Sequence, residues 1–250
     1  MFKLKKVLRA RKRLEVVTNI LFAFFQLNLR YKENRKDYGI EIFEYFYLPW
    51  KTDDEFNSAY NIILDFTLNP KSRLYTIFEL SQKYLNDDSI FIEVGTWKGG
   101  VCGLVSLVNR NKNLDIYCCD TFTGVKNASD KDSFFKNNEY EDANFEDLKK
   151  LEQLVPHKFN IVQGIFPKSI NGIDLSKPIS MAHIDVDTYI SAKESFDYIF
   201  NNLIKGGLII LDDYGGWFTD GVTKFGNELK LRKDLISIPN HLGQLIIFKT

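Results

Sequence analysis

Short apolar runs that alternate with helix-like stretches constrain the fold of this chain more than any other feature. Five runs have the length and composition of buried strands, at residues 90–94, 114–119, 159–162, 179–184 and 208–211. Each is followed within two residues by Gly or Asp. Strands that alternate with helices form βαβ units and a mostly parallel sheet. Because ligands bind beyond the carboxyl ends of such strands, the Gly and Asp residues there are candidate site residues.

The rest of the sequence predicts the elements around this sheet. Helical spacing indicates helices at residues 53–66, 72–84 and 146–154. Two further apolar runs, at 235–238 and 245–248, predict an antiparallel hairpin at one sheet edge. The long charged segment 126–153 is either a solvated loop or, in part, a lid.

At 250 residues the chain is long enough for one large α/β domain with a small appendage. We place the domain at residues 71–250 and an N-terminal helical extension at 1–70, which would serve oligomerisation or shape an acceptor pocket. Within it, residues 3–29 have helical apolar spacing, and every charged residue before Glu15 is basic. Such a helix could contact anionic lipid at a membrane surface. We favour packing on its own domain or in a homodimer, because the apolar stripe needs burial.

Charge and cysteine content narrow the class of protein. The 33 basic and 33 acidic residues give a formal net charge of zero, so no nucleic acid partner is expected. Cys102, Cys118 and Cys119 lack metal-ligand spacing and fit buried free thiols in a reducing compartment. The apolar run 16–25 is shorter than the roughly 20 residues that span a bilayer, and no cleavage site follows it. We therefore expect a cytoplasmic protein without a transmembrane segment.

The stretch FIEVGTWKGG, residues 91–100, has the pattern of a strand, a glycine turn and a helix start. Gly95 would let the backbone turn sharply toward a ligand. The spacing matches neither the dinucleotide fingerprint nor the phosphate loop, so a ligand site and a plain tight turn remain equally open. Asp120 follows the second strand at the separation typical of a ribose-binding carboxylate, and Phe122 could stack on a base.

Three carboxylates end the fourth and fifth strands. Asp185 follows the fourth strand, in HIDVDTY, and Asp212 and Asp213 follow the fifth. Carboxylates that converge would repel one another, and a divalent cation, most commonly Mg²⁺, would relieve that repulsion. Some of these acids could instead cap helices. Asp187 is expected to be a turn residue or to lie behind the metal ligands.

In order along residues 73–225, the blocks EVGTWKGG, DTFTG, VQGIFP, HIDVDTY, GGLIILDDYG and GVTKF resemble those of class I S-adenosylmethionine-dependent O-methyltransferases of the macrocin type. The resemblance implies a seven-stranded Rossmann-like sheet, a bound Mg²⁺ and methyl transfer to a sugar hydroxyl. Thr96 departs from the pattern, since the family often has an apolar residue there. The first seventy residues match no part of the family that we can align.

The resemblance also implies roles for individual residues. Those expected to bind S-adenosylmethionine are Glu93, Gly95, Thr96, Trp97, Lys98 and Gly99 at the methionine moiety, Asp120 and Thr121 at the ribose, Phe122 and Gly164 at the adenine, and Asp185 beside the sulfonium. Those expected to bind the metal are Asp185, Asp212 and Asp213. Asp185 is the first candidate to accept the proton of the acceptor hydroxyl, and His183 the second.

Two other classes of protein compete with this interpretation. In a glycosyltransferase, Asp185 and Asp187 would form a DxD pair that holds Mn²⁺ on a nucleotide-sugar, which leaves Glu93 without a role. A non-enzymatic adaptor built on the basic N-terminal helix would leave the acidic residues unexplained. We therefore predict a metal-dependent sugar O-methyltransferase acting on a sugar or nucleotide-sugar of a surface polysaccharide or natural product.

Overall fold

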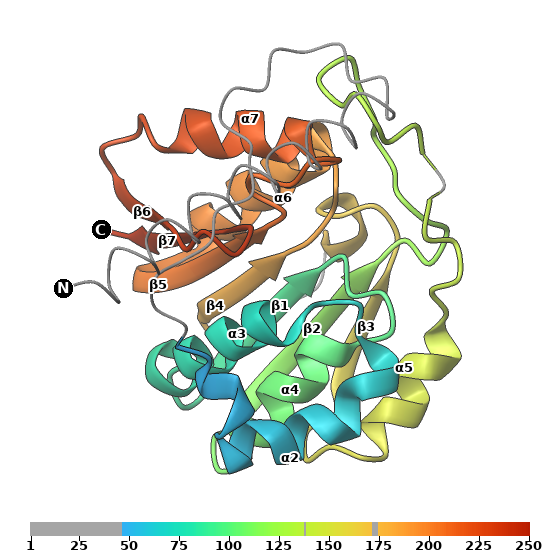
Figure 1. Cartoon of the computed structure of the whole chain (residues 1–250), viewed down its shortest axis with the longest axis vertical. Helices are drawn as coiled ribbons and strands as arrows, with labels where there is room; N and C mark the ends of the chain where they lie inside the picture. The colour runs from blue at the N-terminus through green and yellow to red at the C-terminus, as the bar shows by residue number, and fades with distance from the viewer. Residues whose placement is uncertain (1–46, 138, 172–174) are drawn as a thin grey trace, which may run out of the picture. The chain divides into compact units, whose positions relative to one another are not determined.

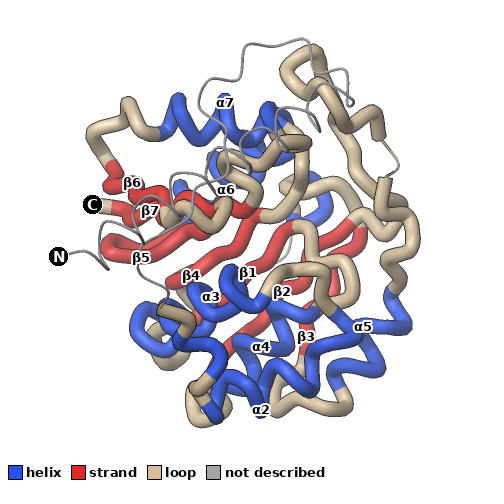
Figure 2. Tube along the Cα trace, in the orientation of Figure 1, coloured by secondary structure: helices blue, strands red, loops and turns tan. Residues whose placement is uncertain are grey.

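A seven-stranded sheet forms the centre of the protein (Figures 1 and 2). The strands are β1 (Ser89–Val94), β2 (Leu114–Asp120), β3 (Phe159–Gln163), β4 (Ile179–Ile184), β5 (Leu203–Asp212), β6 (Leu235–Pro239) and β7 (Gln244–Lys249). Their order is β3-β2-β1-β4-β5-β7-β6, in which the first five are parallel and β7 and β6 form an antiparallel edge hairpin. The predicted doubly wound, mostly parallel sheet with an edge hairpin is confirmed.

The computed structural model describes residues 47–137, 139–171 and 175–250. The predicted basic helix at 3–29 lies outside these residues. No helix in the described ranges combines the length and apolar character needed to cross a bilayer.

Helices cover both faces of the sheet. They are α2 (Asp54–Ile63), α3 (Lys71–Tyr84), α4 (Gly100–Val108), α5 (Phe145–Glu152), α6 (Tyr189–Asn202) and α7 (Asp220–Leu229). In Figure 1, α2 to α5 lie on one face and α6 and α7 on the other. A short 3-10 helix, η2 (Leu64–Phe66), follows α2, so the predicted 53–66 helix is an α-helix with a tighter last turn.

Alternation along the strands explains this two-faced core. Phe91 belongs to the same buried cluster as Phe56 of α2, whereas Ile92 belongs to the cluster that contains Phe196 of α6. Cys118 and Cys119 likewise belong to opposite faces, and both are buried free thiols. Parallel strands buried on both faces are hydrophobic throughout, which is why the sequence showed continuous apolar runs.

The compact unit around the sheet begins at Pro49 and ends at Thr250. Residues 49–70, which the sequence analysis placed in the N-terminal extension, therefore fold with the sheet. Their strongest anchors are Phe56 and Ile63, which are fully buried beside α4. The chain that follows, from Phe66 to Pro70, lies at the carboxyl edge of the strands, where it lines a cavity.

The segment between β2 and α5 is tied to the opposite face of the sheet. The Asp132 carboxylate accepts a hydrogen bond from the Tyr189 amide at 2.9 Å, and the Ser133 amide donates to Asp220 at 3.0 Å. These contacts attach the segment to the first turns of α6 and α7. They bring Tyr140 from its far end to the edge of the cavity.

Candidate active site

The turn after β1 requires glycine. Gly95 has φ +85°, and a Cβ added there would lie 1.7 Å from the Asp185 carbonyl oxygen of the adjacent strand β4. The Asp185 amide in turn donates to the Val94 carbonyl at 2.8 Å. Because β1 and β4 flank the point where the strand order reverses, this close approach opens the crevice in which doubly wound sheets bind ligands.

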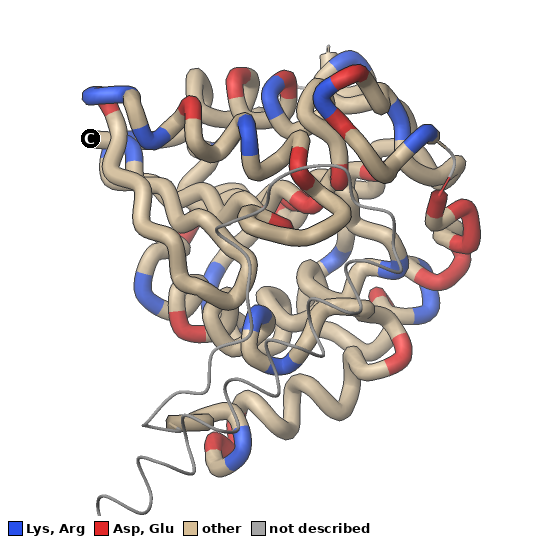
Figure 3. The backbone as a smooth tube through the Cα atoms, turned by 45° about the horizontal axis from the view of Figure 1, so that its top comes forward, with Lys and Arg blue, Asp and Glu red and all other residues tan. Residues whose placement is uncertain are grey.

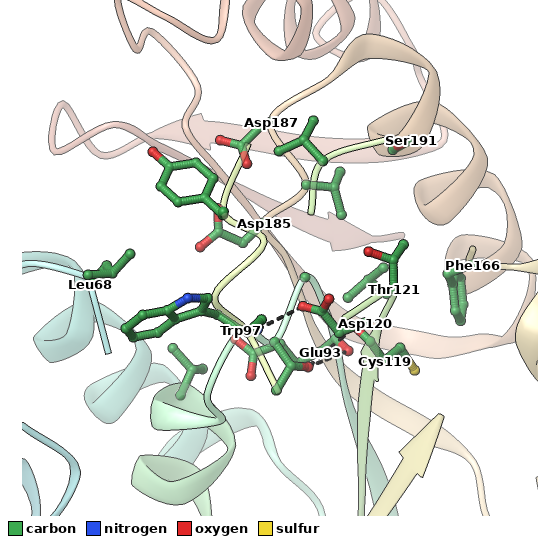
Figure 4. Close-up of a pocket in the computed structure, with 18 of the residues that line it drawn as sticks. Leu68, Glu93, Trp97, Cys119, Asp120, Thr121, Phe166, Asp185, Asp187 and Ser191 are labelled. Carbon is green, nitrogen blue, oxygen red and sulfur yellow. Dashed lines mark hydrogen bonds between the residues drawn. The ribbon is translucent and has the colours of Figure 1, made fainter. Parts of the chain in front are cut away.

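A cavity of about 350 Å³ lies in this crevice. Its size is within the range of small-molecule and cofactor sites. In Figure 4 it extends from Leu68 and Trp97, past Asp120, to Phe166, with Asp185 and Asp187 along one side. The cavity is therefore elongated. The Asp120 carboxylate lies near its middle, and the carboxyl groups of Asp185 and Asp187 lie along one side.

Asp120 is fixed by backbone amides. One carboxylate oxygen accepts from the Trp97 amide and the other from the Phe122 amide, both at 2.8 Å. Burial raises the pKa of Asp120, an effect that these amides oppose. Each oxygen has a second lone pair, so the carboxylate can also accept hydrogen bonds from a ligand in the cavity.

Most of the predicted cofactor residues line this cavity: Glu93, Gly95, Thr96, Trp97, Asp120, Thr121, Gly164 and Asp185. Three do not, namely Lys98, Gly99 and Phe122, and their contacts with the cofactor stay predictions. Gly99, at φ +90°, is the N-cap residue of α4, and an added Cβ would lie 3.3 Å from Leu148 and Leu151 of α5. Its role is close helix packing.

The other two, Lys98 and Phe122, contact the loop before α5 and the start of α5. Lys98 lies over the Trp97 ring and pairs with Asp142 at 3.6 Å. Phe122 has φ +51°, which turns its side chain out of the register of the strand, and its ring meets Phe145 edge-on at 6.5 Å. Phe122 thus packs beside the cavity rather than lining it, and its stacking on adenine stays a prediction. Ile165 and Phe166 line that end of the cavity instead.

A buried row of charged side chains crosses the three central strands. His183 of β4 is fully buried, with its Nδ1 2.9 Å from Glu93 of β1 and its Nε2 3.1 Å from Asp212 of β5. Burial opposes charging of the ring, but the two carboxylates raise the pKa of His183 well above its ordinary value. Both ring nitrogens are occupied and the ring lies outside the cavity lining. These contacts favour Asp185 over His183 as the proton acceptor, as the sequence analysis ranked them, and neither role is tested.

Asp212 belongs to this row rather than to the cavity. Its Oδ1 accepts from Arg73 of α3 at 2.8 Å and its Oδ2 from His183. Burial opposes ionisation of Asp212, yet His183 and Arg73 lower its pKa below the ordinary value. The same Arg73 nitrogen lies 2.9 Å from Asp213 Oδ1 and so bridges the two consecutive acids.

Three other carboxyl groups, which we call the acid cluster, line the cavity: Asp185, Asp187 and Asp213. Burial raises the pKa of each, and repulsion between neighbouring carboxylates adds to the rise. Asp187 and Asp213 have φ of +62° and +61°, so each follows its strand through a left-handed turn. Asp187 is thus a turn residue, as expected, but its carboxyl lies within the cluster.

A model of the macrocin O-methyltransferase (TylF) family matches residues 62–243. The matched range contains the glycine turn, Asp120 and the acid cluster. The chain belongs to the macrocin O-methyltransferase family. As predicted from its sequence blocks, it is an S-adenosylmethionine-dependent sugar O-methyltransferase.

Solved structures share the fold of this macrocin O-methyltransferase family member. The O-methyltransferase NovP is 17% identical with a TM-score of 0.61 and covers 74% of this chain and 82% of its own. The calicheamicin methyltransferase CalS11 is 16% identical with a TM-score of 0.58, covering 82% and 94%. An O-methyltransferase from Bacillus cereus, solved in complex with SAH, is 12% identical with a TM-score of 0.50, covering 79% and 92%. No curated protein matches the chain in sequence.

The family resemblance implied a metal, and the carboxyl oxygens are the hard ligands that Mg²⁺ prefers. Among the predicted ligands, Asp185 and Asp213 face the cavity, and His183, Asp185 and Asp212 each have a ligand atom within 4.8 Å of the others. Arg73 contacts Oδ1 of Asp212 and His183 contacts its Oδ2, while Glu93 contacts the other nitrogen of His183. Asp187 offers a further carboxyl donor beside the predicted Asp185 and Asp213, and the assignment of Asp212 as a ligand stays a prediction.

Arg73 is the main site residue of this family member that the sequence analysis missed. It contacts residues 139 and 140 positions away, a separation that no motif spans. A signal was nevertheless present: the first turn of α3 carries Lys71 and Arg73 but no acid. Basic residues there oppose the helix dipole, so they indicate a charged partner elsewhere.

Proposed function

We propose that this protein transfers the methyl group of S-adenosylmethionine to a sugar hydroxyl held between the cofactor cavity and the acid cluster, with a divalent cation taking part. The observation that carries the proposal is the placement of Asp185. It lines the cofactor cavity and also belongs to the cluster of carboxyl groups beside it. A group placed there can contact both a bound cofactor and an acceptor.

The cofactor would lie extended along the cavity. Gly95 and the backbone up to Trp97 would hold its methionine end, and Asp120 would accept hydrogen bonds from the ribose hydroxyls. The adenine would lie against Phe166. The hydroxyl of Ser195, which lines the cavity and is buried without a hydrogen-bond partner, supports a polar contact at this end.

The reaction needs a group that takes the acceptor proton. The hydroxyl oxygen attacks the methyl carbon, the carbon–sulfur bond breaks, and S-adenosylhomocysteine leaves with the electron pair. The proton would pass to Asp185, one of whose oxygens accepts a weak hydrogen bond from Asn69 at 3.3 Å. Holding the hydroxyl and the methyl group in line supplies much of the catalysis in such a transfer.

Charge balance supports the cation. Among the described residues, five carboxyl groups (Glu93, Asp185, Asp187, Asp212 and Asp213) lie in or beside the cluster, against three cationic side chains, Arg73, His183 and Lys126, that contact them or line the same cavity. Asp185, Asp187 and Asp213 would hold the ion. When bound, it would lower the pKa of the acceptor hydroxyl.

The test combines binding with turnover. Calorimetry with S-adenosylhomocysteine should show one site, which Asp120→Asn weakens about a hundredfold, because charged hydrogen bonds contribute about 1.5–3 kcal/mol each. A screen of glycosides and nucleotide-sugars for methyl transfer, read by mass spectrometry, identifies the acceptor. EDTA and Asp213→Asn should each abolish turnover and leave cofactor binding intact. Full turnover in EDTA would refute the cation, and binding of a nucleoside diphosphate without S-adenosylhomocysteine would refute the whole proposal.

A further inference from the structure

The chain between β2 and α5 forms one wall of the cofactor cavity. We call residues 124–137 and 139–143 the strap. Five residues of the strap line the cavity: Gly124, Val125, Lys126, Tyr140 and Ala143. Its outgoing and returning parts are joined where the Val125 amide donates to the Glu139 carbonyl at 2.8 Å. The shape of this side of the cavity therefore depends on what holds the strap in place.

The strap is held at Asp132, in its middle. Acidic and basic positions are mixed along the strap (Figure 3), a pattern that on its own indicates a solvated loop. The Asp132 carboxylate, however, has partners on both of its oxygens. Oδ2 accepts from the Ser129 amide at 3.0 Å and from the Ser129 hydroxyl at 2.8 Å, and Oδ1 accepts from the Tyr189 amide of α6 at 2.9 Å. One carboxylate thus shapes a turn within the strap and also ties that turn to a helix.

Helix α6 lacks a cap of its own, and Asp132 supplies one. The first amides of a helix have no partners within it, and a negative charge beside them is favourable. The first turn of α6 contains no acid, and the side chain of its N-cap residue, Thr188, accepts no capping hydrogen bond. The Thr188 hydroxyl instead donates to the Lys126 carbonyl at 3.0 Å, as does the Ser191 hydroxyl at 3.2 Å. The start of α6 therefore holds the strap at two points.

A glycine of α7 makes room for the contact between Asp132 and α6. A Cβ added at Gly221 would lie 1.8 Å from Asp132 Oδ1 and 3.0 Å from the Tyr189 nitrogen. Gly221 lies in the first turn of α7, where alanine would favour the helix more than glycine does. The helix itself thus gives no reason for glycine at this position. The space beside Gly221 is occupied by the Asp132 carboxylate.

We propose that Asp132 is a positioning residue of the cofactor site, which fixes the strap to the first turn of α6 and thereby sets the wall against which S-adenosylmethionine binds. Asp132 lies outside the lining of the cavity, so it acts through the strap and not by touching the cofactor. Helix α6 contributes Ser191 and Ser195 to the same cavity, so the contact joins two parts of one wall. The proposal rests on the binding of the cofactor in this cavity.

The test compares Asp132→Ala with the loss of a helix cap elsewhere. Asp53→Ala is the matched control, because the Asp53 carboxylate caps α2 through the Phe56 amide at 2.9 Å and lies outside the cavity lining. Each full-length variant is measured by thermal unfolding and by calorimetry with S-adenosylhomocysteine. Both should have a lower Tm, since each loses a cap. Only Asp132→Ala should bind S-adenosylhomocysteine more weakly, by about tenfold, which corresponds to about 1.4 kcal/mol.

Gly221→Ala separates positioning from stability. Its added Cβ displaces the Asp132 carboxylate from Tyr189, while alanine itself favours α7. The affinity for S-adenosylhomocysteine should again fall about tenfold, even if the Tm is unchanged. Wild-type affinity in Gly221→Ala or in Asp132→Ala, or an equal loss in Asp53→Ala, would overturn the role of Asp132. Absence of S-adenosylhomocysteine binding by the wild type would instead refute the cofactor site on which the proposal rests.

Discussion

Replacing Arg73 with methionine removes the guanidinium that bridges Asp212 and Asp213 while keeping most of the side-chain volume. The Arg73 nitrogen lies 2.8 and 2.9 Å from the two carboxylates, and Asp212 is fully buried. Without the guanidinium, Asp212 keeps His183 as its cationic partner, but Asp213 and the rest of the acid cluster repel one another more strongly. The variant should therefore be less stable, and it should respond more strongly to added cations.

The loss can be estimated from burial. Removing one partner of a fully buried ion pair costs about 3–5 kcal/mol. Arg73 and Asp213 are 19% and 20% exposed, so water recovers part of that cost. Removing a basic residue from a first helical turn also returns about 0.3–1 kcal/mol. We expect a net loss of about 2 kcal/mol, which for a domain of this size lowers the Tm by about 4–8 °C.

Thermal unfolding followed by circular dichroism, in EDTA and then in millimolar MgCl₂, measures both effects. Mg²⁺ should raise the Tm of Arg73→Met more than that of the wild type, because the cation can occupy the place of the guanidinium. Lys71→Met is the matched control, because it removes a basic residue from the same helical turn. The Lys71 side chain donates to Asn57 and lies away from the acids. Equal Tm values for Arg73→Met and Lys71→Met, with equal responses to Mg²⁺, would refute the electrostatic account of the cluster.

Three further substitutions test other parts of the site. Gly95→Ala should weaken S-adenosylhomocysteine binding at least tenfold by calorimetry, because its Cβ would meet the Asp185 carbonyl oxygen at 1.7 Å; an unchanged Kd would contradict this close approach. Ser195→Ala should raise the free energy of unfolding by about 1 kcal/mol, since it removes an unpaired buried hydroxyl, and weaken cofactor binding about fivefold; a less stable variant would show that the hydroxyl is paired. Burial opposes the ionisation of Asp220, but the hydrogen bond from the Ser133 amide holds the pKa of Asp220 below its ordinary value. The ionised carboxylate therefore stabilises the folded state above about pH 4, and this stabilisation is lost as the pH falls through the folded pKa. In urea titrations, Asp220→Asn should accordingly cost about 1.5 kcal/mol near pH 7 and progressively less as the pH falls below about 4, and a cost that does not change with pH would exclude the ionised form.

Continuous apolar runs made the strands predictable, and the one large error in the strand bounds, at the fifth strand, has a local cause. The fifth strand was expected at 208–211 but spans Leu203–Asp212. Gly206, at φ +77°, and Gly207 interrupt its apolar pattern, and the pairing with β4 shifts register beside them. A bulge of this kind leaves the residues on both sides of it in the sheet. The residues before the bulge, however, lack the continuous apolar pattern by which a strand is recognised in a sequence.

Residues at strand ends were harder to assign than the strands themselves, because side-chain alternation stops there. Gly95 and Asp185 follow central strands directly, and they lie against each other at the crevice. Phe122, Asp187 and Asp213 lie two, three and one residues beyond the ends of β2, β4 and β5, in left-handed turns. Such turns redirect a side chain in a way that period-two spacing does not describe. Their directions therefore emerged only from the fold.

The buried row could have been inferred from alternation, and it explains why two consecutive aspartates act differently. Glu93, His183 and Asp212 follow Phe91, Met181 and Ile210 at a spacing of two, and those three residues all belong to the core face covered by α2 to α5. Titratable side chains on three adjacent strands, pointing into one apolar layer, must satisfy one another. Asp212 is thus directed by its strand toward His183 and Arg73, while Asp213, released from the strand, turns to the cavity. Since His183 contacts Glu93 beside the cofactor cavity and Asp212 beside the acid cluster, a single fixed ring sets the distance between the two halves of the site.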